Sequence, residues 1–433
     1  MEVDQTAADA VLELEGQGDG SKAIAAYRKL IFECSLPETE QEVKELETAI
    51  YRLANFYAKK EKVEPLVKLV KEIRPLFIHF PKVKTAKIVR TLIDLVSRLQ
   101  GNKPTQLISD LCLDCIEWAK SEQRTFLKHR VETRLSSIYV DMTKYEEALA
   151  LLKELLKEVK QLDDKLLLVE IHLIETRANF NCDNLPKARA SLTAAKTNAN
   201  AIHCPPLSQA EIDLWSGIVS LREKDPRTAF SYLYEAFEAF HVNKDESNYT
   251  SKDYNHTRAL QALRCQLLCR IMQDEPSACK QMVQQKNMLG YQMHDSVQAI
   301  LQIAAAYEDR SLKKLEKVLA AHPVEDPVIR HHLRELYDTF LEKNLLKILE
   351  PFSSVQLARV AELIELPVDK TQQKLSQLIL DQKLLGTLDE GKGNLILFPK
   401  STLRPTCKRL LETIKHSSDC IDSLALLSKK IFD

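Results

Sequence analysis

The chain has 433 residues, of which 45% are hydrophobic and 28% charged, a balance typical of a folded globular protein. Its 61 basic and 62 acidic residues give a formal net charge of −1, which excludes a global positive field for nucleic acid or an anionic membrane. The nine glycines form neither a dinucleotide-binding fingerprint nor a phosphate-binding P-loop.

The first residues lack the pattern of an export signal. MEVDQTAADA is acidic and has neither the basic nor the apolar region of a signal peptide. No uninterrupted apolar stretch approaches the ~18 residues that a membrane span needs. We therefore expect a protein of the cytoplasm and nucleus, with no membrane partner, whose ten cysteines are reduced rather than paired in disulfides.

A helical hairpin signature stands out in IYVDMTKYEEALALLKELL (138–156). Tyr139 ends a first helix, Ala148 lies in the first turn of a second, and Leu152 and Leu155 continue the buried face of that second helix. This pattern resembles the tetratricopeptide repeat, in which small residues let two antiparallel helices approach closely. Thr143 takes the place of the usual turn glycine.

Positions equivalent to Ala148 recur at Ala23, Leu66, Leu107, Ala188 and Ala229, with successive steps of 43, 41, 41, 40 and 41 residues. A period near 41 over six units predicts an α-solenoid, in which each hairpin buries its apolar face only against its neighbours. Gly217, twelve residues before Ala229, is expected at a close helix crossing. A polar segment at 242–255 interrupts the register, and helical pairs resume after it.

Two residue clusters were candidates for metal or catalytic sites. Cys112 and Cys115 form a C-x-x-C inside a helical stretch, but a zinc site needs four ligands and no second pair follows; we interpret both as buried core residues. His331 and His332 precede Glu335 without completing an H-E-x-x-H motif, and we interpret them as helix-surface histidines. No nucleophile motif such as G-x-S-x-G occurs. We therefore expect no catalytic residue, no metal and no cofactor.

Residues 348–398 change their hydrophobic period inside a chain that otherwise has a helical one. Ser353 and Ser354 are placed to cap a following amphipathic helix, and Pro367 opens a second one. Two apolar runs then flank a short segment with two glycines, which predicts a β-hairpin. Two helices followed by a hairpin form a winged helix.

The charge of this winged helix does not favour nucleic acid. Residues 348–398 contain five basic and seven acidic residues, a net charge of −2. Because phosphate contacts dominate nucleic-acid affinity, the element is more suited to protein contacts than to DNA. A hairpin of this kind leaves a strand with one unpaired edge, and we expect Asn394–Phe398 to offer that edge to a neighbouring protein.

The last residues, 401–433, predict one further helix. An apolar stripe with alternating three- and four-residue steps runs along it, at Cys407, Leu411, Ile414, Ser417, Ile421, Leu424 and Ile431. The stripe has no evident partner within the chain. Either it packs against helices of other proteins, or it docks on the solenoid of its own chain.

A repeat array that leads into a winged helix and a terminal helix resembles the arrangement of PCI-domain proteins. Local sequence similarity to a PCI subunit of the 26S proteasome lid spans roughly residues 74–433. The blocks that carry it are DCIEWAKSEQRTFLK (114–128), NLPKARASLTAAKTNANAIHCPP (184–206), KDPRTAFSYLYEAFEAF (224–240), ILEPFSSVQ (348–356) and KLSQLILDQK (374–383). The alternatives are a subunit of another PCI complex, such as COP9 signalosome subunit 2, and a nucleic-acid-binding winged-helix protein.

The resemblance implies a mostly α-helical chain with three parts. An N-terminal solenoid of tetratricopeptide-like hairpins occupies residues 1–222. A PCI domain occupies 223–400, with helical repeats at 223–345 and the winged helix at 346–400. A bundle helix occupies 401–433.

The resemblance further implies a non-catalytic scaffold that assembles the lid and braces it against the ATPase base and the 20S core, in ubiquitin-dependent protein degradation. In such proteins the winged helices associate through their hairpins and the terminal helices gather into a bundle. The implied partners are other PCI subunits of the lid, ATPase subunits of the base and the α-ring of the 20S core, with no nucleic acid. The expected partner-interface residues are Leu384, Leu385, Asn394, Ile396 and Phe398 in the hairpin, and Leu411, Ile414, Ile421, Leu424 and Ile431 in the terminal helix.

Overall fold

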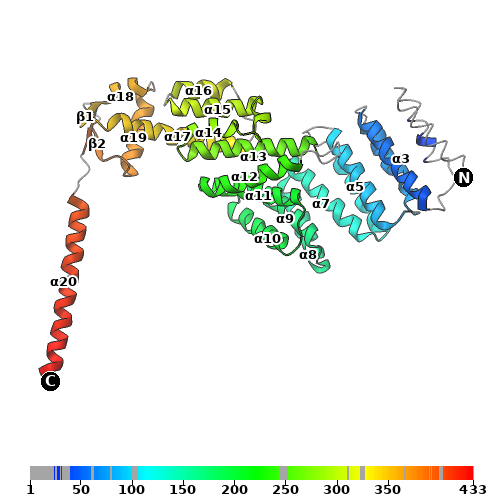
Figure 1. The fold of residues 1–433 in the computed structure, drawn as a ribbon, viewed down its shortest axis with the longest axis horizontal. Coiled ribbons are helices and arrows are strands. Elements are labelled where there is room, and N and C mark those ends of the chain that lie inside the picture. The colour runs from blue at the N-terminus through cyan, green and yellow to red at the C-terminus, as the bar shows by residue number, and fades with distance from the viewer. Residues whose placement is uncertain are drawn as a thin grey trace. The chain divides into compact units, whose positions relative to one another are not determined.

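The computed structural model describes residues 24, 27–29, 31, 40–59, 63–78, 80–99, 106–243, 252–309, 312–321, 327–364, 367–389, 391, 393–398 and 403–432. Within these residues the chain is almost entirely helical, with one small sheet (Figure 1). It divides into two compact units, Met1–Gln273 and Asp274–Asp433. The predicted fold class, a helical solenoid followed by a winged helix and a terminal helix, is confirmed.

The first unit is a succession of antiparallel helices, each packed on the next in chain order (Figure 1). Its elements are α3 (Glu40–Lys59), α4 (Val63–Glu72), the 3-10 helix η1 (Arg74–Ile78), α5 (Lys82–Leu99), α6 (Gln106–Ser121), α7 (Thr125–Asp141), α8 (Tyr145–Leu162), α9 (Lys165–Asn181), α10 (Leu185–Asn200), α11 (Pro206–Arg222), α12 (Pro226–Val242) and α13 (Lys252–Met272).

Left-handed turns recur with the repeat. Thr143, Asp183 and Lys224, which are 40 and 41 residues apart, have φ angles of 63°, 57° and 65°. In the first of these turns the Lys144 amide donates to the Tyr139 carbonyl at 2.9 Å, which closes the last turn of α7 as a Schellman motif does. The period in the sequence is therefore the period of a helix–turn–helix unit, although none of the three turns uses glycine.

The small repeat residues lie in the core, as predicted. Ala148, Ala188 and Ala229 are completely buried, and so is Leu66. Leu107, however, is exposed, because the apolar face of α6 is shifted by one residue to the buried Ile108. The prediction for Leu107 was therefore wrong by one position, while Ala23 lies outside the described residues.

Gly217 lies at a close contact between α11 and α12. A Cβ atom on this residue would lie 2.5 Å from Cγ of Leu233 and 3.2 Å from the carbonyl oxygen of Ala229. No carbon atom fits at 2.5 Å, so the two helices cross at this distance only because residue 217 has no side chain. The predicted role of Gly217 in a helix crossing is confirmed.

Polar contacts connect neighbouring repeats across longer sequence distances. The Arg222 guanidinium lies 2.8 Å from an Asp183 carboxylate oxygen, and Arg130 lies 3.3 Å from Glu170. In the buried layer the Gln266 amide donates to the Leu233 carbonyl at 2.7 Å. The first two bonds join residues about one repeat apart, and the third joins the adjacent helices α12 and α13. Together they favour one register between neighbouring helices.

The polar segment that we expected at 242–255 is shorter. Residues 244–251 lie outside the description, and α13 already begins at Lys252 and contains the buried Asn255. The division between the two compact units falls at residue 273, inside the region that we assigned to a PCI domain. The domain boundaries at 222, 345 and 400 remain predictions.

The second unit contains three shorter helices, a long helix, the winged helix and a terminal helix. Its elements are α14 (Pro276–Val283), the 3-10 helix η3 (Leu289–Tyr291), α15 (Asp295–Glu308), α16 (Leu312–Ala321), α17 (Pro327–Leu349), β1 (Ser354–Gln356), α18 (Leu357–Ile364), α19 (Val368–Leu380), β2 (Gly386–Asp389), β3 (Asn394–Leu397) and α20 (Leu403–Phe432).

The cysteine and histidine pairs have different outcomes. Cys112 and Cys115 are buried on α6, as predicted. His332 is completely buried with its Nδ1 atom 3.6 Å from Glu335, so its assignment to the helix surface was wrong. The apolar residues of α17 near His331 and His332 have no regular spacing, so the sequence does not show which of the two histidines faces the core.

In the parts of the chain that the structure describes, no helix is long and apolar enough to cross a membrane.

Replacing Gly217 by alanine tests the close crossing. We expect the added methyl group to push α11 away from α12 and to lower the free energy of unfolding by about 1–3 kcal/mol, despite the better helix propensity of alanine. Thermal unfolding followed by circular dichroism measures the effect. Gly290→Ala is the control, because a Cβ there would have no neighbour within 4 Å. Equal melting temperatures for the two variants would contradict the packing role of Gly217.

Candidate interaction surfaces

The sheet of the winged helix has three antiparallel strands in the order β1-β3-β2. Ile396, in the middle of β3, lies opposite Ser354 of β1 on one side and opposite Thr387 of β2 on the other. The ladder continues beyond the assigned strands, since the Phe398 amide donates to the Leu385 carbonyl at 2.8 Å. Strand β3 is therefore the central strand.

This order corrects two expectations. Asn394–Phe398 does not offer an unpaired edge, because both sides of β3 are already hydrogen-bonded within the chain. Ser354 does not cap α18 but begins β1, and the helix starts only at Leu357. The second error caused the first: a strand of three residues is too short to produce a recognisable alternation, so its pairing with β3 was not foreseen.

The two faces of the sheet differ in burial. Val355 and Leu395 lie opposite each other on the face that packs into the core, and both are buried. Leu385, Ile396 and Phe398 belong to the other face, and they are 37%, 42% and 53% exposed. The structure thus brings together three of the five hairpin residues that the sequence singled out, as an exposed apolar surface on a sheet. We call these three residues the wing patch.

The other two hairpin residues have different positions. Leu384 and Asn394 are only half-buried. Leu384 lies in the tight turn after α19, where its amide donates to the Leu378 carbonyl at 3.1 Å. Asn394 begins β3 and pairs with Asp389 and Gln356. Neither belongs to the wing patch as we define it.

The sheet has two outer edges, on β1 and on β2, and the longer of them lies on β2. Opposite residues in an antiparallel pair alternate between hydrogen-bonded and non-hydrogen-bonded pairs. Because Leu385 bonds to Phe398, the backbone groups of Gly386 and Leu388 point away from β3, toward the open side of β2. Gly386 also allows a close approach to β3, because a Cβ there would lie 2.6 Å from the Ile396 carbonyl oxygen.

Ion pairs hold α19 and the following turn against α17. The Lys383 ammonium donates to a Glu342 carboxylate oxygen at 2.6 Å, and this bond raises the pKa of Lys383. Lys374 bonds Asp338 at 2.7 Å. These two contacts link the winged helix to the long helix before it, so that the hairpin is presented on an ordered support.

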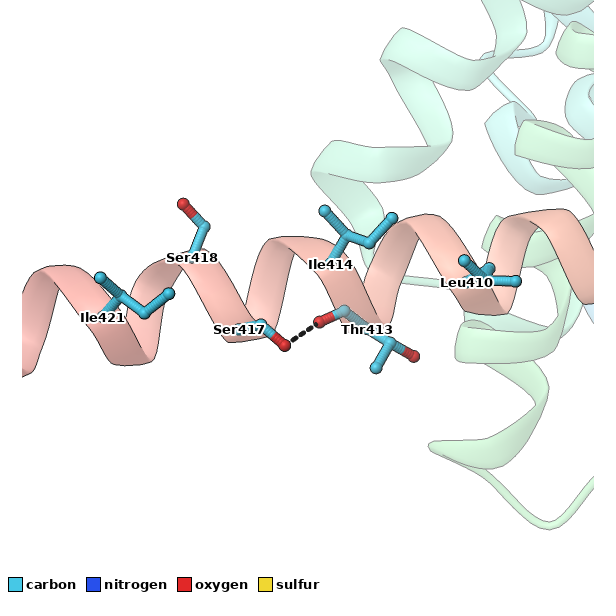
Figure 2. A pocket seen from close by; sticks show the side chains of 6 residues that line it. All are labelled: Leu410, Thr413, Ile414, Ser417, Ser418 and Ile421. Atoms are coloured by element: carbon cyan, nitrogen blue, oxygen red, sulfur yellow. Dashed lines mark hydrogen bonds between the residues drawn. The ribbon is translucent and has the colours of Figure 1, made fainter.

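The terminal helix α20 carries the second exposed apolar surface. Every side chain of this helix whose exposure the structure describes is exposed. Its large apolar side chains are 56–65% exposed, and they are Leu410, Leu411, Ile414, Ile421, Leu424 and Leu427. Figure 2 shows Leu410, Ile414 and Ile421 along the helix, with the smaller Thr413, Ser417 and Ser418 between them, around a shallow hollow of about 420 Å³.

The sequence identified most of this surface. Four of its predicted residues, Leu411, Ile414, Ile421 and Leu424, are exposed, while the side chain of Ile431 lies outside the described residues. It missed Leu410 and Leu427, which are equally exposed. Heptad spacing from Leu424 leads back to residue 410 and would have found it.

Catalytic chemistry has little support in the described residues. Burial raises the pKa of Asp213 to about 6, and perturbed carboxyl groups are candidates for catalysis. The Gln209 amide, however, donates to both oxygens of this carboxyl at 3.2 Å within the same helix. We interpret Asp213 as a buried carboxyl in the packing of α11.

Within the described ranges, no three His, Cys, Asp or Glu side chains are grouped to hold a metal ion.

Two family models match the sequence. One, described as the 26S proteasome regulatory subunit RPN6 N-terminal domain, matches residues 4–142. The other, described as the PCI domain, matches residues 312–399, which include the winged helix.

Relatives with known names match almost the whole chain. A protein of Arabidopsis thaliana named 26S proteasome non-ATPase regulatory subunit 11 homolog is 42% identical over 424 residues, which cover 97% of each chain. A protein of Schizosaccharomyces pombe named probable 26S proteasome regulatory subunit rpn6 is 42% identical over 409 residues, 94% of each chain. The 26S proteasome regulatory subunit RPN6 of Saccharomyces cerevisiae is 35% identical over 383 residues, 88% of this chain and 86% of that one.

A pair of proline variants tests the assignment of the open edge. Leu388→Pro removes an amide that points away from β3 and should leave the sheet folded. Thr387→Pro removes an amide that bonds to β3 and should destabilise the winged helix by about 1–3 kcal/mol. Hydrogen exchange of the β3 amides measures the difference. If both variants expose β3 equally, the edge has been assigned to the wrong residues.

Proposed function

The chain belongs to the family of the 26S proteasome regulatory subunit RPN6, also named non-ATPase regulatory subunit 11, and we propose that it is a non-catalytic scaffold of the lid of the regulatory particle. Similarity to proteasome subunits over 97% of the chain carries this proposal. The arrangement of exposed apolar surfaces supports it, because a scaffold must leave contact surfaces open until its partners arrive.

The terminal helix is suited to a bundle of several helices. At 100° per residue, the apolar positions from Leu411 to Leu424 spread over roughly 140° of the helix surface. A two-stranded coiled coil needs only a narrow seam, whereas a wider face contacts more than one neighbour. Burial of each Leu or Ile side chain would contribute about 1.5–3 kcal/mol, so a few of them can anchor the subunit. We therefore assign α20 to the bundle formed by terminal helices of the lid.

The winged helix is suited to a lateral contact with another PCI subunit. Its open edge on β2 can add a strand of a neighbour, with backbone hydrogen bonds giving affinity. The wing patch of Leu385, Ile396 and Phe398 lies beside this edge and adds apolar area. Compared with the expectation from the sequence, the pairing strand is β2 rather than β3.

The N-terminal solenoid has a separable role as a brace. Neighbouring repeats stabilise one another, so the first ones are not required for the folding of the last. We propose that the first repeats contact ATPase subunits of the base and the α-ring of the 20S core, as the family resemblance implies. The match of residues 4–142 to the RPN6 N-terminal domain supports a role specific to this family for that part.

We propose that the protein acts in the cytoplasm and nucleus, within ubiquitin-dependent protein degradation, and without an activity of its own. The name of the Arabidopsis thaliana relative, a non-ATPase regulatory subunit, supports the absence of catalysis. A signalosome subunit and a nucleic-acid-binding protein were the alternatives from the sequence. No specific observation favours either of them.

Substitutions along the α20 stripe test its role in assembly. We replace four exposed apolar residues by glutamine, which keeps helix propensity: Leu411, Ile414, Ile421 and Leu424. Because these side chains are exposed in the chain itself, the melting temperature of the monomer, measured at low concentration, should stay within about 1 °C. Incorporation into the lid should be lost, measured by co-purification of the tagged chain with other lid subunits.

Four glutamines on the opposite face of α20 form the matched control. They replace Glu412, His416, Asp419 and Ser423. These variants should incorporate normally, because the stripe is unchanged. Normal incorporation of the stripe variant, or a drop of its melting temperature as a monomer, would refute the assembly role and place the stripe in an intramolecular contact.

Deletion of residues 1–100 tests the brace. The hairpins after α7 keep their neighbours, and only α6 and α7 lose their contacts with α5, so the truncated chain should still fold and enter the lid. Attachment of the regulatory particle to the core should weaken, seen as an increased amount of free 20S core on native gels. Fully intact 26S particles with wild-type stability would show that the first repeats do not brace the complex.

A further inference from the structure

The α20 stripe has a pattern of large and small residues that is not required of a simple apolar helix. Ser417 and Ser428 interrupt it at two heptad positions, while Leu410, Ile414, Ile421 and Leu424 fill the others. Ser417 lines the hollow together with Leu410, Ile414 and Ile421 (Figure 2). A partner helix must therefore present a large side chain where this helix has a small one.

A second copy of the same helix meets this requirement when it runs in the opposite direction. In the register that places Ser417 opposite Ile421 of the second copy, Ile414 faces Leu424 of the second copy. Leu410 faces Ser428 of the second copy. Each of these facing pairs, which we call a layer, occurs twice because the dimer is symmetric. Both serines at the heptad positions, Ser417 and Ser428, therefore face a large side chain of the second copy. A parallel pair would instead place each serine against its own copy and leave a void.

The serines of the stripe can be buried without losing a hydrogen bond. The Ser417 hydroxyl donates to the Thr413 carbonyl at 2.8 Å, as Figure 2 shows. The Ser428 hydroxyl donates to the Ala425 carbonyl at 2.9 Å. Because these bonds lie within the helix, contact with an isoleucine or leucine leaves no donor without an acceptor.

The charges beside the stripe also favour the antiparallel direction. Lys415 and Asp422 occupy the same flank of the helix, and both are exposed. In the proposed register Lys415 comes within one residue of the level of Asp422 of the second copy, and the opposite contact repeats by symmetry. In a parallel pair the two copies of this flank lie on opposite sides of the interface, so this contact between opposite charges cannot form.

We propose that in the free chain α20 pairs with α20 of a second copy as an antiparallel coiled coil, in the register that sets Ser417 opposite Ile421. This homodimer covers only the central line of the apolar face, from Leu410 to Ser428, and leaves Leu411 and Leu427 at its flanks. It must dissociate when α20 enters a bundle whose neighbours cover the whole face. The inference concerns the unassembled chain, and it can fail while the scaffold role stands.

Sedimentation equilibrium of the full chain, from nanomolar to high micromolar concentration, measures the pairing. Ile421→Ser creates two layers without a large residue and should weaken dimerisation about ten-fold or more. Adding Ser417→Ile to this variant restores one large residue in each of these layers and should recover most of the affinity. Glu412→Gln on the opposite face should have no effect. A chain that stays monomeric, or a dimer insensitive to Ile421→Ser, would overturn the proposal.

Cross-linking with a short bis-maleimide tests the direction. Cys407 and Cys420 are both exposed on α20. In the antiparallel register the two copies of Cys420 are only roughly 3 Å apart along the axis, whereas the two copies of Cys407 are roughly 36 Å apart. Dimers should therefore form in Cys407→Ser and disappear in Cys420→Ser. Cross-linking through Cys407 would demonstrate a parallel pair and overturn the register. Normal co-purification with lid subunits in these variants would leave the proposed function intact.

Discussion

Close packing between successive helical hairpins is the interaction on which the rest of the structure depends. Ala148, Ala188 and Ala229 are buried at equivalent places, and Gly217 lets α11 and α12 cross at a distance that no side chain would allow. Each hairpin buries its apolar face only against its neighbours. The array therefore supports itself without one central core.

The C-terminal end of the array carries the consequences of this constraint. The winged helix contacts α17 through polar groups such as Lys383 and Glu342, and the outer face of its sheet stays exposed. The terminal helix has an apolar stripe but no buried side chain among those described. The wing patch and the stripe of α20 are both apolar and exposed. Such surfaces suit a subunit whose apolar residues become buried only when other proteins bind to them.

The sequence predicted those features that depend on local periodicity. The 41-residue period, the small residue at position 217 and the exposed stripe at Ile414 and Ile421 follow from spacing along one or two helices, where 3.6 residues per turn determines the face. The order of the sheet depends on a contact between residues 354–356 and 394–396, and a strand of three residues leaves no periodic pattern. The burial of His332 likewise depends on tertiary packing rather than on its neighbours in sequence.

The central claim is that the exposed surfaces at the C-terminal end are completed by other subunits, while the solenoid is already complete by itself. Hydrogen exchange of the chain, compared between the free monomer at low concentration and the purified 26S particle, tests it most directly. An isolated, solvent-surrounded helix opens easily, so α20 and the outward amides of Gly386 and Leu388 should exchange fast in the free chain and slowly in the particle. The amides of α9–α12 should be protected equally in both. Unchanged exchange in α20 on assembly would contradict the account.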